Sequence, residues 1–267
     1  MTRTLLVSSF TPHPARFGGA IRLRTLLDML ASTSAVTLVT YCDDPVEQAT
    51  IEYLEQVCEH HRLLGPSPGD RAGKWKLQLR GMVDGRTYQY WAYHSPEMQR
   101  AIDETLAATV FDRVVVELSQ MACFDLSAID PARTTTVLDL QNVEADLLAR
   151  RAATQTSRAR RWALGLEARR FRQIEIDACR RFDLVTVPSD VDRAALGARA
   201  PGLRIETIPN TVDVADFAPP DEASRLAGEV VFVGACHVDA NRDGIRWYLD
   251  EIHPLVRSAR PDVHLTV

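Results

Sequence analysis

The sequence predicts an α/β protein in which helices cover both faces of a parallel sheet. Short apolar runs alternate with amphipathic stretches along the chain, which is the pattern of strand and crossover helix. Serine, aspartate and proline stand at the starts of several helical stretches, where they favour capping. The 267 residues are 46% hydrophobic and 25% charged, with a formal net charge of −5, which is ordinary for a globular protein.

The first elements are a buried strand and an amphipathic helix. Residues 4–9 form a short apolar run, which predicts a buried parallel strand. The leucines from Leu23 to Leu30 recur at i, i+3, i+4 and i+7, which predicts a helix with one apolar face. Residues 36–41 form the next apolar run, and the capping residues from Asp43 predict a helix that reaches about Glu59.

The middle of the chain continues the alternation. Residues 65–69 are rich in glycine and proline and predict a loop, after which Ser95 caps a helix that ends near residue 108. The remaining expected elements are strands over 112–117, 135–140, 184–187 and 203–208, a long helical stretch over 143–181 with a break near 154–157, and a short helix capped by Ser189.

A turn-rich, proline-bounded connector is predicted over residues 209–228. It separates a first domain over 1–208 from a strand, helix and strand over 229–267. One such βαβ unit is shorter than the minimum of about 50 residues for a domain. We therefore expect the chain to hold one domain and the incomplete start of a second, and so to be a fragment of a larger protein.

Composition excludes several classes of function. The five cysteines are scattered without CxxC spacing, and the seven histidines lack metal-ligand spacing, so we predict no metal site and a reducing, cytoplasmic location. A slightly acidic chain argues against nucleic-acid binding. The sequence lacks the dinucleotide fingerprint GxGxxG. No apolar stretch approaches the length of a membrane span, and the N-terminus does not resemble a signal peptide.

Gly18 and Gly19 stand between the first strand and its helix. Glycine there lets the backbone approach a ligand, and the helix N-terminus favours an anion. Arg22 and Arg24 follow early in the helix and are candidate phosphate contacts. We therefore predict that Gly18, Gly19 and Arg22 bind substrate. The alternative is a plain turn followed by a solvated helix face.

A second polar cluster spans residues 139–144, at the end of a strand. Gln141, Asn142 and Glu144 are the candidate catalytic residues, because functional side chains gather at the carboxyl edge of a parallel sheet. The alternative is helix capping, with Asn142 as the N-cap and Glu144 complementing the helix dipole.

The helical stretch over 150–181 carries ten arginines and three acids. A basic helix of this kind can dock on an anionic membrane. The alternative is an exposed helix with ion pairs, for which the spacing offers Glu167 with Arg170, Arg172 with Glu175, and Asp177 with the arginines at 180 and 181. These pairs would serve only its later half.

Several segments together resemble the retaining, nucleotide-sugar-dependent glycosyltransferases of the GT-B fold, family-four type. The Asp139–Leu147 segment is similar to the family's "HNVE" segment, and Glu167–Asp183 to its "E…R…E…CxxFD" helix. The other matching segments are Phe17–Arg22, Ile208–Phe217, which is similar to "IPNGVD…F", and Val231–Gly234 followed by Asn241, Trp247 and Pro254.

The resemblance implies two Rossmann-like domains, of which this chain would hold the acceptor-side domain and the first βαβ unit of the nucleotide-sugar domain. The implied reaction is transfer of a sugar, of hexosyltransferase type, from a nucleotide-diphosphate sugar to a glycan, lipid-linked or small-molecule acceptor, as in polysaccharide biosynthesis. Gly18 and Gly19 would line the cleft, and Gly234 would face the donor diphosphate. No cofactor or metal is implied; the nucleotide-diphosphate sugar is a co-substrate.

The sequence departs from the family at Gln141, where the family has histidine. Glutamine can hydrogen-bond to a sugar hydroxyl but cannot act as a base. The family's acidic donor motif would lie beyond Val267, so we expect this chain alone to have little transferase activity. The alternative is a non-catalytic module that binds the acceptor or a membrane. In that case we expect the protein to lie at the inner face of the membrane as a peripheral protein.

Overall fold

The computed structural model describes residues 1–71, 73–84, 86–212, 214, 227–236 and 238–267. The chain divides into two compact units, residues 1–212 and 213–267. Most of the connector predicted over 209–228 lies outside the described residues. Within the described residues, no helix combines the length and the apolar character that crossing a bilayer requires.

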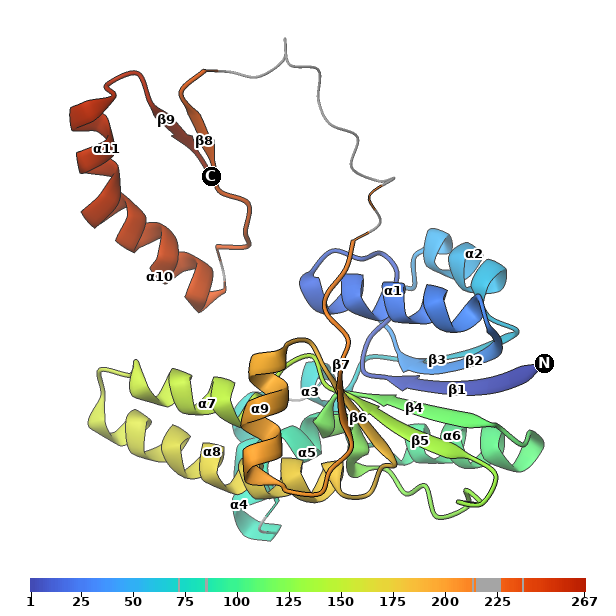
Figure 1. Ribbon diagram of the computed structural model, residues 1–267. Coiled ribbons are helices and arrows are strands. Elements are labelled where there is room, and N and C mark those ends of the chain that lie inside the picture. The colour runs from blue at the N-terminus through green and yellow to red at the C-terminus, as the bar shows by residue number, and fades with distance from the viewer. Residues whose placement is uncertain (72, 85, 213, 215–226, 237) are drawn as a thin grey trace. The chain divides into compact units, whose positions relative to one another are not determined.

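The first unit is built on one seven-stranded sheet in which every pairing is parallel (Figure 1). Its strand order is β3-β2-β1-β4-β5-β6-β7. The strands are β1 (Thr2–Ser8), β2 (Ser34–Tyr41), β3 (His60–Leu64), β4 (Arg113–Glu117), β5 (Thr135–Asp139), β6 (Leu184–Val187) and β7 (Ile205–Thr207). This arrangement confirms the predicted α/β class.

Helices cover both faces of this sheet, as predicted. They are α1 (Gly18–Ala31), α2 (Gln48–Val57), α3 (Pro68–Arg71), α4 (Lys74–Asp84), α5 (Tyr88–Tyr93), α6 (Pro96–Ala108), α7 (Glu144–Ala153), α8 (Arg158–Cys179) and α9 (Asp190–Arg199), with a 3-10 turn η1 (Ser119–Cys123). The predicted caps of α6 and α9 are confirmed, because Ser95 accepts the backbone N–H of Met98 and Ser189 that of Asp192.

The core has two halves because successive side chains of a strand point to opposite faces. Leu6 packs with apolar side chains of α1 and α2, whereas Leu5 and Val7 pack with those of α6, η1 and the end of α8. Both faces of the strand are therefore buried. This explains why the strands read as continuous apolar runs rather than as alternating ones.

The strand order reverses between β1 and β4. The chain first builds outward from β1 to β3 and then returns to add β4 beside β1. In open parallel sheets ligands bind at such a switch point, outside the carboxyl ends of the strands. Ser9, Leu118 and the start of α1 follow these strand ends.

The segment from residue 43 to residue 94 differs most from the prediction. Helix α2 begins at Gln48 rather than at Asp43, and its N-cap Glu47 makes no side-chain cap bond. Strand β3 (His60–Leu64) was not predicted, since as an edge strand it is only half-buried and its polar residues hide the pattern. The predicted loop over 65–69 runs into α3 at Pro68.

Helices α7 and α8 pack against each other as a hairpin (Figure 1). The predicted break at 154–157 is confirmed, because α7 ends at Ala153 and α8 begins at Arg158 with Ser157 as its N-cap. A small apolar cluster of its own holds the hairpin together, made of Ala145, Leu148, Ala168 and Phe171.

The second unit contains the predicted strand, helix and strand. Strands β8 (Glu229–Val231) and β9 (His264–Thr266) pair in parallel. The helical connection runs through α10 (Asp239–Trp247), a π-helical turn η4 (Tyr248–Ile252) and α11 (His253–Ala259). Among its described residues, Ile245 and Val263 are the buried apolar side chains.

Candidate functional site

Polar side chains from three strand ends and one helix meet at the switch point between β1 and β4. Gln141, which follows β5, donates from Nε2 to Glu117 Oε1 at 2.5 Å and to the Gly19 carbonyl at 3.2 Å. Glu117 ends β4, and Gly19 opens α1. The structure thus brings Gln141 and Gly19, predicted from separate motifs, into direct contact.

The orientation of the Gln141 amide follows from its partners. Both neighbours of Nε2 are oxygen atoms that accept hydrogen bonds, so the nitrogen must face them. Oε1 accepts no hydrogen bond from the described residues. Gln141 is half-buried, and what it can offer a ligand is therefore a carbonyl acceptor rather than an N–H donor.

Glu117 is the most deeply buried ionisable group of the site, with 0% of its surface exposed. Its Oε2 lies 3.1 Å from Ser9 Oγ and 3.4 Å from Ser9 N. Burial, reinforced by the nearby Asp139 carboxylate, raises the pKa of Glu117 to about 8. At neutral pH the carboxyl is mainly protonated, and it holds Gln141 through its second oxygen.

Leu118, the residue after Glu117, has a positive φ of 72°. A leucine in this region is uncommon and costs backbone energy. Its backbone N–H donates to the Asp139 carbonyl at 2.8 Å, which turns the chain from β4 into η1. Backbone strain of this kind clusters at functional sites, and here it lies at the switch point.

Arg22 and Asp139 form a buried ion pair beside this cluster. Arg22 is 6% exposed and binds both carboxylate oxygens of Asp139, at 2.7 and 3.1 Å. It also donates to the Ile208 carbonyl at 2.7 Å and to Asn210 Oδ1 at 3.1 Å. Thr186 donates to Asp139 at 2.6 Å. Arg22 thus ties α1 and β5 to the segment that leaves β7.

These contacts correct the interpretation of Arg22 as part of a solvated helix face. Four of its five N–H groups are engaged by the protein, so Arg22 positions the chain at this edge of the sheet. Its predicted contact with substrate stays a prediction. Arg24 does lie on the solvated face, 3.8 Å from Asp28.

Gly18 and Gly19 differ in their surroundings. A Cβ on Gly19 would lie 2.4 Å from Gln141 Oε1 and 2.9 Å from the Phe17 ring, whereas a Cβ on Gly18 would meet nothing within 4 Å. Glycine is therefore required only at position 19, where the start of α1 and the Gln141 side chain approach each other closely. The N-cap of α1 is Phe17, which supplies no side-chain cap bond, so the first N–H groups of α1 keep capacity for a ligand.

Asn142 and Glu144 lie at the start of α7. The interpretation of Asn142 as its N-cap is wrong, because the N-cap is Val143 and Asn142 is exposed. Glu175 of α8 caps α7 instead, accepting the N–H groups of Glu144 at 2.9 Å and Ala145 at 3.3 Å. Burial raises the pKa of Glu144 and that of Glu175, the latter to about 7.

The predicted ion pair between Arg172 and Glu175 is therefore wrong, since Glu175 turns inward to the α7 N-terminus. In the described part of the chain Glu167 and Arg170 form no ion pair, while Asp177 and Arg180 do, at 3.5 Å. Arg181 donates to the carbonyls of Ala122 and Phe124 rather than to an acid.

Gly234 lies in the loop between β8 and α10 of the second unit. A Cβ on Gly234 would lie 3.0 Å from both Asn241 Nδ2 and the Phe232 ring. Its predicted role toward a donor diphosphate stays a prediction.

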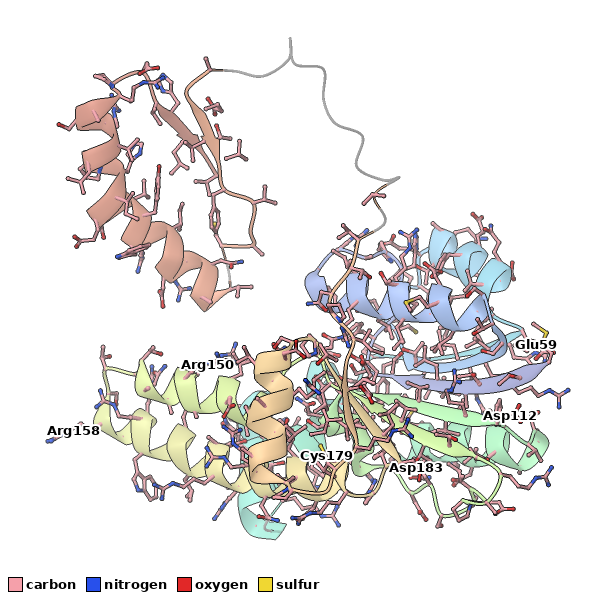
Figure 2. All side chains as sticks on the ribbon, viewed as in Figure 1. Glu59, Asp112, Arg150, Arg158, Cys179 and Asp183 are labelled. Atoms are coloured by element: carbon pink, nitrogen blue, oxygen red, sulfur yellow. The ribbon has the colours of Figure 1, made fainter. Side chains whose placement is uncertain are left out.

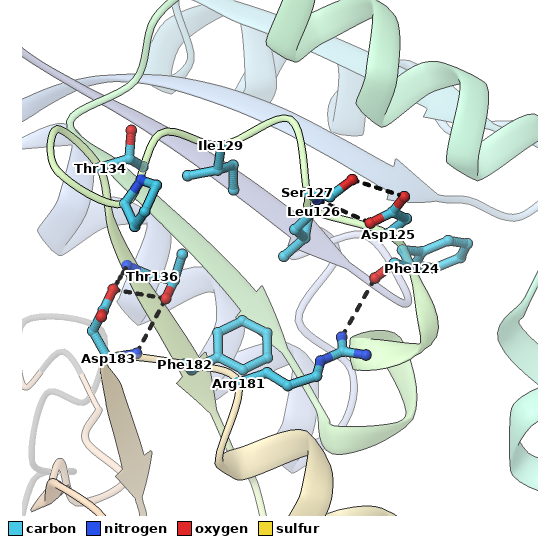
Figure 3. Close-up of a pocket in the computed structure, with 11 residues that line it drawn as sticks. Phe124, Asp125, Leu126, Ser127, Ile129, Thr134, Thr136, Arg181, Phe182 and Asp183 are labelled. Atoms are coloured by element: carbon cyan, nitrogen blue, oxygen red, sulfur yellow. Dashed lines mark hydrogen bonds between the residues drawn. The ribbon is translucent and has the colours of Figure 1, made fainter.

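Two cavities lie at opposite edges of the sheet. One of about 490 Å³ adjoins the carboxyl ends of β2 and β3 and is lined by Tyr41, Leu64, Arg80, Trp91 and His94, among others. It lies at the same edge of the sheet as Gln141, Glu117 and Gly19. The other, of about 350 Å³, is lined by residues at the starts of β5 and β6, including Thr136 and Asp183 (Figure 3). That is the edge at which parallel sheets seldom bind ligands.

Three residues of the site lie outside the predicted clusters: Ser9, Glu117 and Leu118. Asp139 belongs to the predicted polar cluster over 139–144, although it was not a candidate catalytic residue. Glu117 carries a signal in the sequence, because an acid that ends a run of three valines places a charge at the edge of a buried strand. Asp139 stands in the same position on β5. The strain at Leu118 has no such signal, because leucine does not indicate a positive φ.

No family model matches this chain. It is 22% identical over 270 residues to an uncharacterised 44.6 kDa protein in the cps region of Klebsiella pneumoniae, and covers 64% of that protein's length. The structure of Anabaena HepE in complex with UDP and glucose matches 98% of this chain at a TM-score of 0.50 and 15% identity, over 68% of HepE.

These findings show the fold. The likeness to HepE confirms a Rossmann-like α/β architecture of the GT-B type. The chain spans less than two thirds of the curated relative's length.

Proposed function

We propose that this chain is the acceptor-side part of a glycosyltransferase that moves a sugar from a nucleotide-diphosphate donor to a glycan, lipid-linked or small-molecule acceptor. The observation that carries the proposal is the Gln141 carbonyl held against Gly19 at the switch point of a GT-B-type sheet. HepE, which shares this fold, was solved with UDP and glucose. Because this chain covers 64% of the curated relative and 68% of HepE, the activity is assigned to a protein of the relatives' full length.

In this proposal Gln141 orients the sugar. Its Oε1 accepts a hydrogen bond from a sugar hydroxyl, while Glu117 and Gly19 hold Nε2 and prevent the amide from turning. A carboxamide has no usable basicity, so Gln141 moves no proton. The N-terminus of α1 faces the negative charge of the departing diphosphate. No metal or cofactor enters the proposal.

The acceptor is assigned to the cavity of about 490 Å³ beside β2 and β3. It shares the carboxyl edge of the sheet with Gln141, and a hollow lined by both Ser9 and Tyr41 lies between the two sites. The Arg80 guanidinium lies 3.4 Å from the centre of the Trp91 ring. Aromatic and cationic groups in one cavity favour an acceptor with an apolar face and a polar or anionic end.

The test uses the two neighbouring glycines as a matched pair. In a protein of the relatives' full length, release of nucleoside diphosphate from a panel of nucleotide sugars is measured for Gly19→Ala and Gly18→Ala. Because a Cβ at position 19 displaces Gln141, we expect kcat/KM to fall at least about tenfold, or ~1.4 kcal/mol. Gly18→Ala should stay near the parent activity.

Equal effects of the two substitutions would contradict the assigned role of Gln141. Release of no nucleoside diphosphate from any donor would contradict the transfer reaction itself. We also expect the 267-residue chain alone to show little or no transfer.

A second candidate function is a non-catalytic module that binds an acceptor or an anionic membrane. Gln141 in the position of the family's histidine and the arginines of residues 150–181 favour it. The assay of nucleoside diphosphate release separates this candidate from the transferase. A module of this kind would bind its ligand at the inner face of the membrane and would turn over no nucleotide sugar.

A further inference from the structure

The α7–α8 hairpin extends beyond the sheet of the first unit (Figure 1). Its apolar cluster involves the start of α7 and the middle of α8. Residues 150–163, which we call the hairpin tip, lie beyond that cluster. Their side chains are exposed except for Ala152, which is buried, and Gln155, which is half-buried. The tip therefore adds little to the core of the protein.

The tip is basic throughout. It carries five arginines and no acid in a chain whose net charge is −5. None of the five forms an ion pair with a described residue. Figure 2 shows Arg158 at this end of the hairpin. Only Arg161 has a described side-chain contact, to the Gln155 carbonyl at 2.8 Å.

One large aromatic side chain lies among these charges. Trp162 is 72% exposed, on the first turns of α8 between arginines and alanines. Exposure of an indole to water forfeits the free energy that its burial would supply. A tryptophan next to several arginines is typical of surfaces that bind at the boundary between lipid headgroups and acyl chains. There the indole ring is buried, while the arginine side chains stay at the lipid phosphates.

We propose that the hairpin tip docks the protein on an anionic lipid surface, with the Trp162 ring entering the headgroup layer and Arg150, Arg158 and Arg160 facing lipid phosphates. The hairpin tip fits a lipid surface better than a nucleic acid. An extended nucleic acid would be repelled by the negative net charge of the rest of the protein, whereas a bilayer would contact only the projecting tip. The proposal rests on the hairpin alone and does not depend on sugar transfer.

The test is flotation of the 267-residue chain with vesicles of phosphatidylcholine, with and without phosphatidylglycerol. We expect binding only to the anionic vesicles, weakening as salt rises. The variant R150Q/R158Q/R160Q removes three arginines whose side chains have no described contact. Each of the three substitutions should lower the affinity for anionic vesicles about fivefold, and the triple variant should lose affinity on the order of a hundredfold.

A matched control removes the same charge elsewhere. R3Q/R133Q/R204Q changes three exposed arginines at the starts of β1, β5 and β7, at the opposite edge of the sheet, and should bind as the parent does. Trp162→Ala should weaken binding, whereas Trp75→Ala, at another exposed tryptophan, should not. The blue shift of tryptophan emission on binding should be lost in Trp162→Phe only.

Three outcomes would overturn the proposal. One is absence of binding to anionic vesicles at low salt. A second is an equal loss of binding in both triple variants, because the attraction would then be a property of total charge. The third is preferential binding of a nucleic acid. Binding of single-stranded RNA with higher affinity than vesicles, abolished by R150Q/R158Q/R160Q, would reassign the tip to a nucleic-acid partner. Circular dichroism of each variant checks that the fold is kept.

Discussion

Arg22 and Asp139 bury two opposite charges in the first unit. A buried pair adds little net stability over an apolar pair, but removing one partner leaves the other charge uncompensated. We expect Arg22→Met to lower the free energy of unfolding by about 3–5 kcal/mol, measured by urea denaturation.

The control for this substitution lies on the same helix. Arg24 forms an exposed pair with Asp28, and such pairs contribute at most about 1 kcal/mol. Arg24→Met should therefore cost less than about 1 kcal/mol. A loss in Arg22→Met no larger than in Arg24→Met would show that Asp139 finds another partner.

Glu117 makes stability depend on pH. Burial raises its pKa from an ordinary 4.5 to about 8, so the folded protein holds this proton more tightly than the unfolded chain does. The resulting stabilisation is complete below pH 4.5 and is lost as the pH rises to about 8, at up to about 1.4 kcal/mol per pH unit. Urea unfolding across this range measures it.

Glu117→Gln should flatten this dependence, because glutamine does not titrate. Glu175, whose pKa burial raises to about 7, contributes a similar slope below pH 7. The difference in slope between the parent protein and Glu117→Gln therefore measures the contribution of Glu117. Glu55→Gln, at an exposed position on α2, should retain the slope of the parent protein; an unchanged slope in Glu117→Gln would assign the titration to another group.

At the scale of elements, the serine caps differ in strength. Ser95 is buried and accepts the Met98 N–H at 3.1 Å, whereas Ser157 is exposed and accepts the Arg160 N–H at 3.5 Å. We expect Ser95→Ala to cost about 1–2 kcal/mol and Ser157→Ala about 0.5 kcal/mol. Thermal and urea unfolding measure both. A larger loss in Ser157→Ala would contradict the geometry of the caps.

Whether a helix end has a local cap also decided which elements could be predicted. The Ser-Pro-Glu sequence at residues 95–97 specifies the start of α6 by itself. Helix α7 has no such cap, because Val143 stands at its N-cap. Its N–H groups are satisfied by Glu175, about thirty residues away in sequence, and a periodicity argument cannot find a cap on another helix.

At the scale of the whole molecule, the two units differ in the size of their cores. In the first, apolar side chains are buried on both faces of a seven-stranded sheet. Among the described residues of the second, two apolar side chains are buried beside a two-stranded sheet. A unit this small buries little of its surface and is marginally stable by itself.

Hydrogen exchange of the 267-residue chain should report this difference. We expect the amides of β8 and β9 to exchange at least about tenfold faster than those of β1 and β4, since their opening costs less free energy. β3, an edge strand of the first sheet, is the internal comparison and should lie between them. Equal protection in β8 and β1 would contradict the marginal stability of the second unit.

The sequence by itself determined the α/β class, most strands of the first sheet, the capped helices, the hairpin break and the βαβ pattern after residue 229. These features depend on local periodicity and on capping residues a few positions apart, which a single chain displays directly. It also marked Gln141 and Gly19 as candidates, although in separate motifs.

Only the tertiary structure decided how these residues meet. The reversal of strand order brings β4 beside β1, and this places Glu117 under Gln141 and Arg22 against Asp139. The partners of these contacts are 24 and 117 residues apart, so no local pattern records them. Burial then sets the charge state of Glu117, because its raised pKa follows from desolvation rather than from its neighbours in sequence.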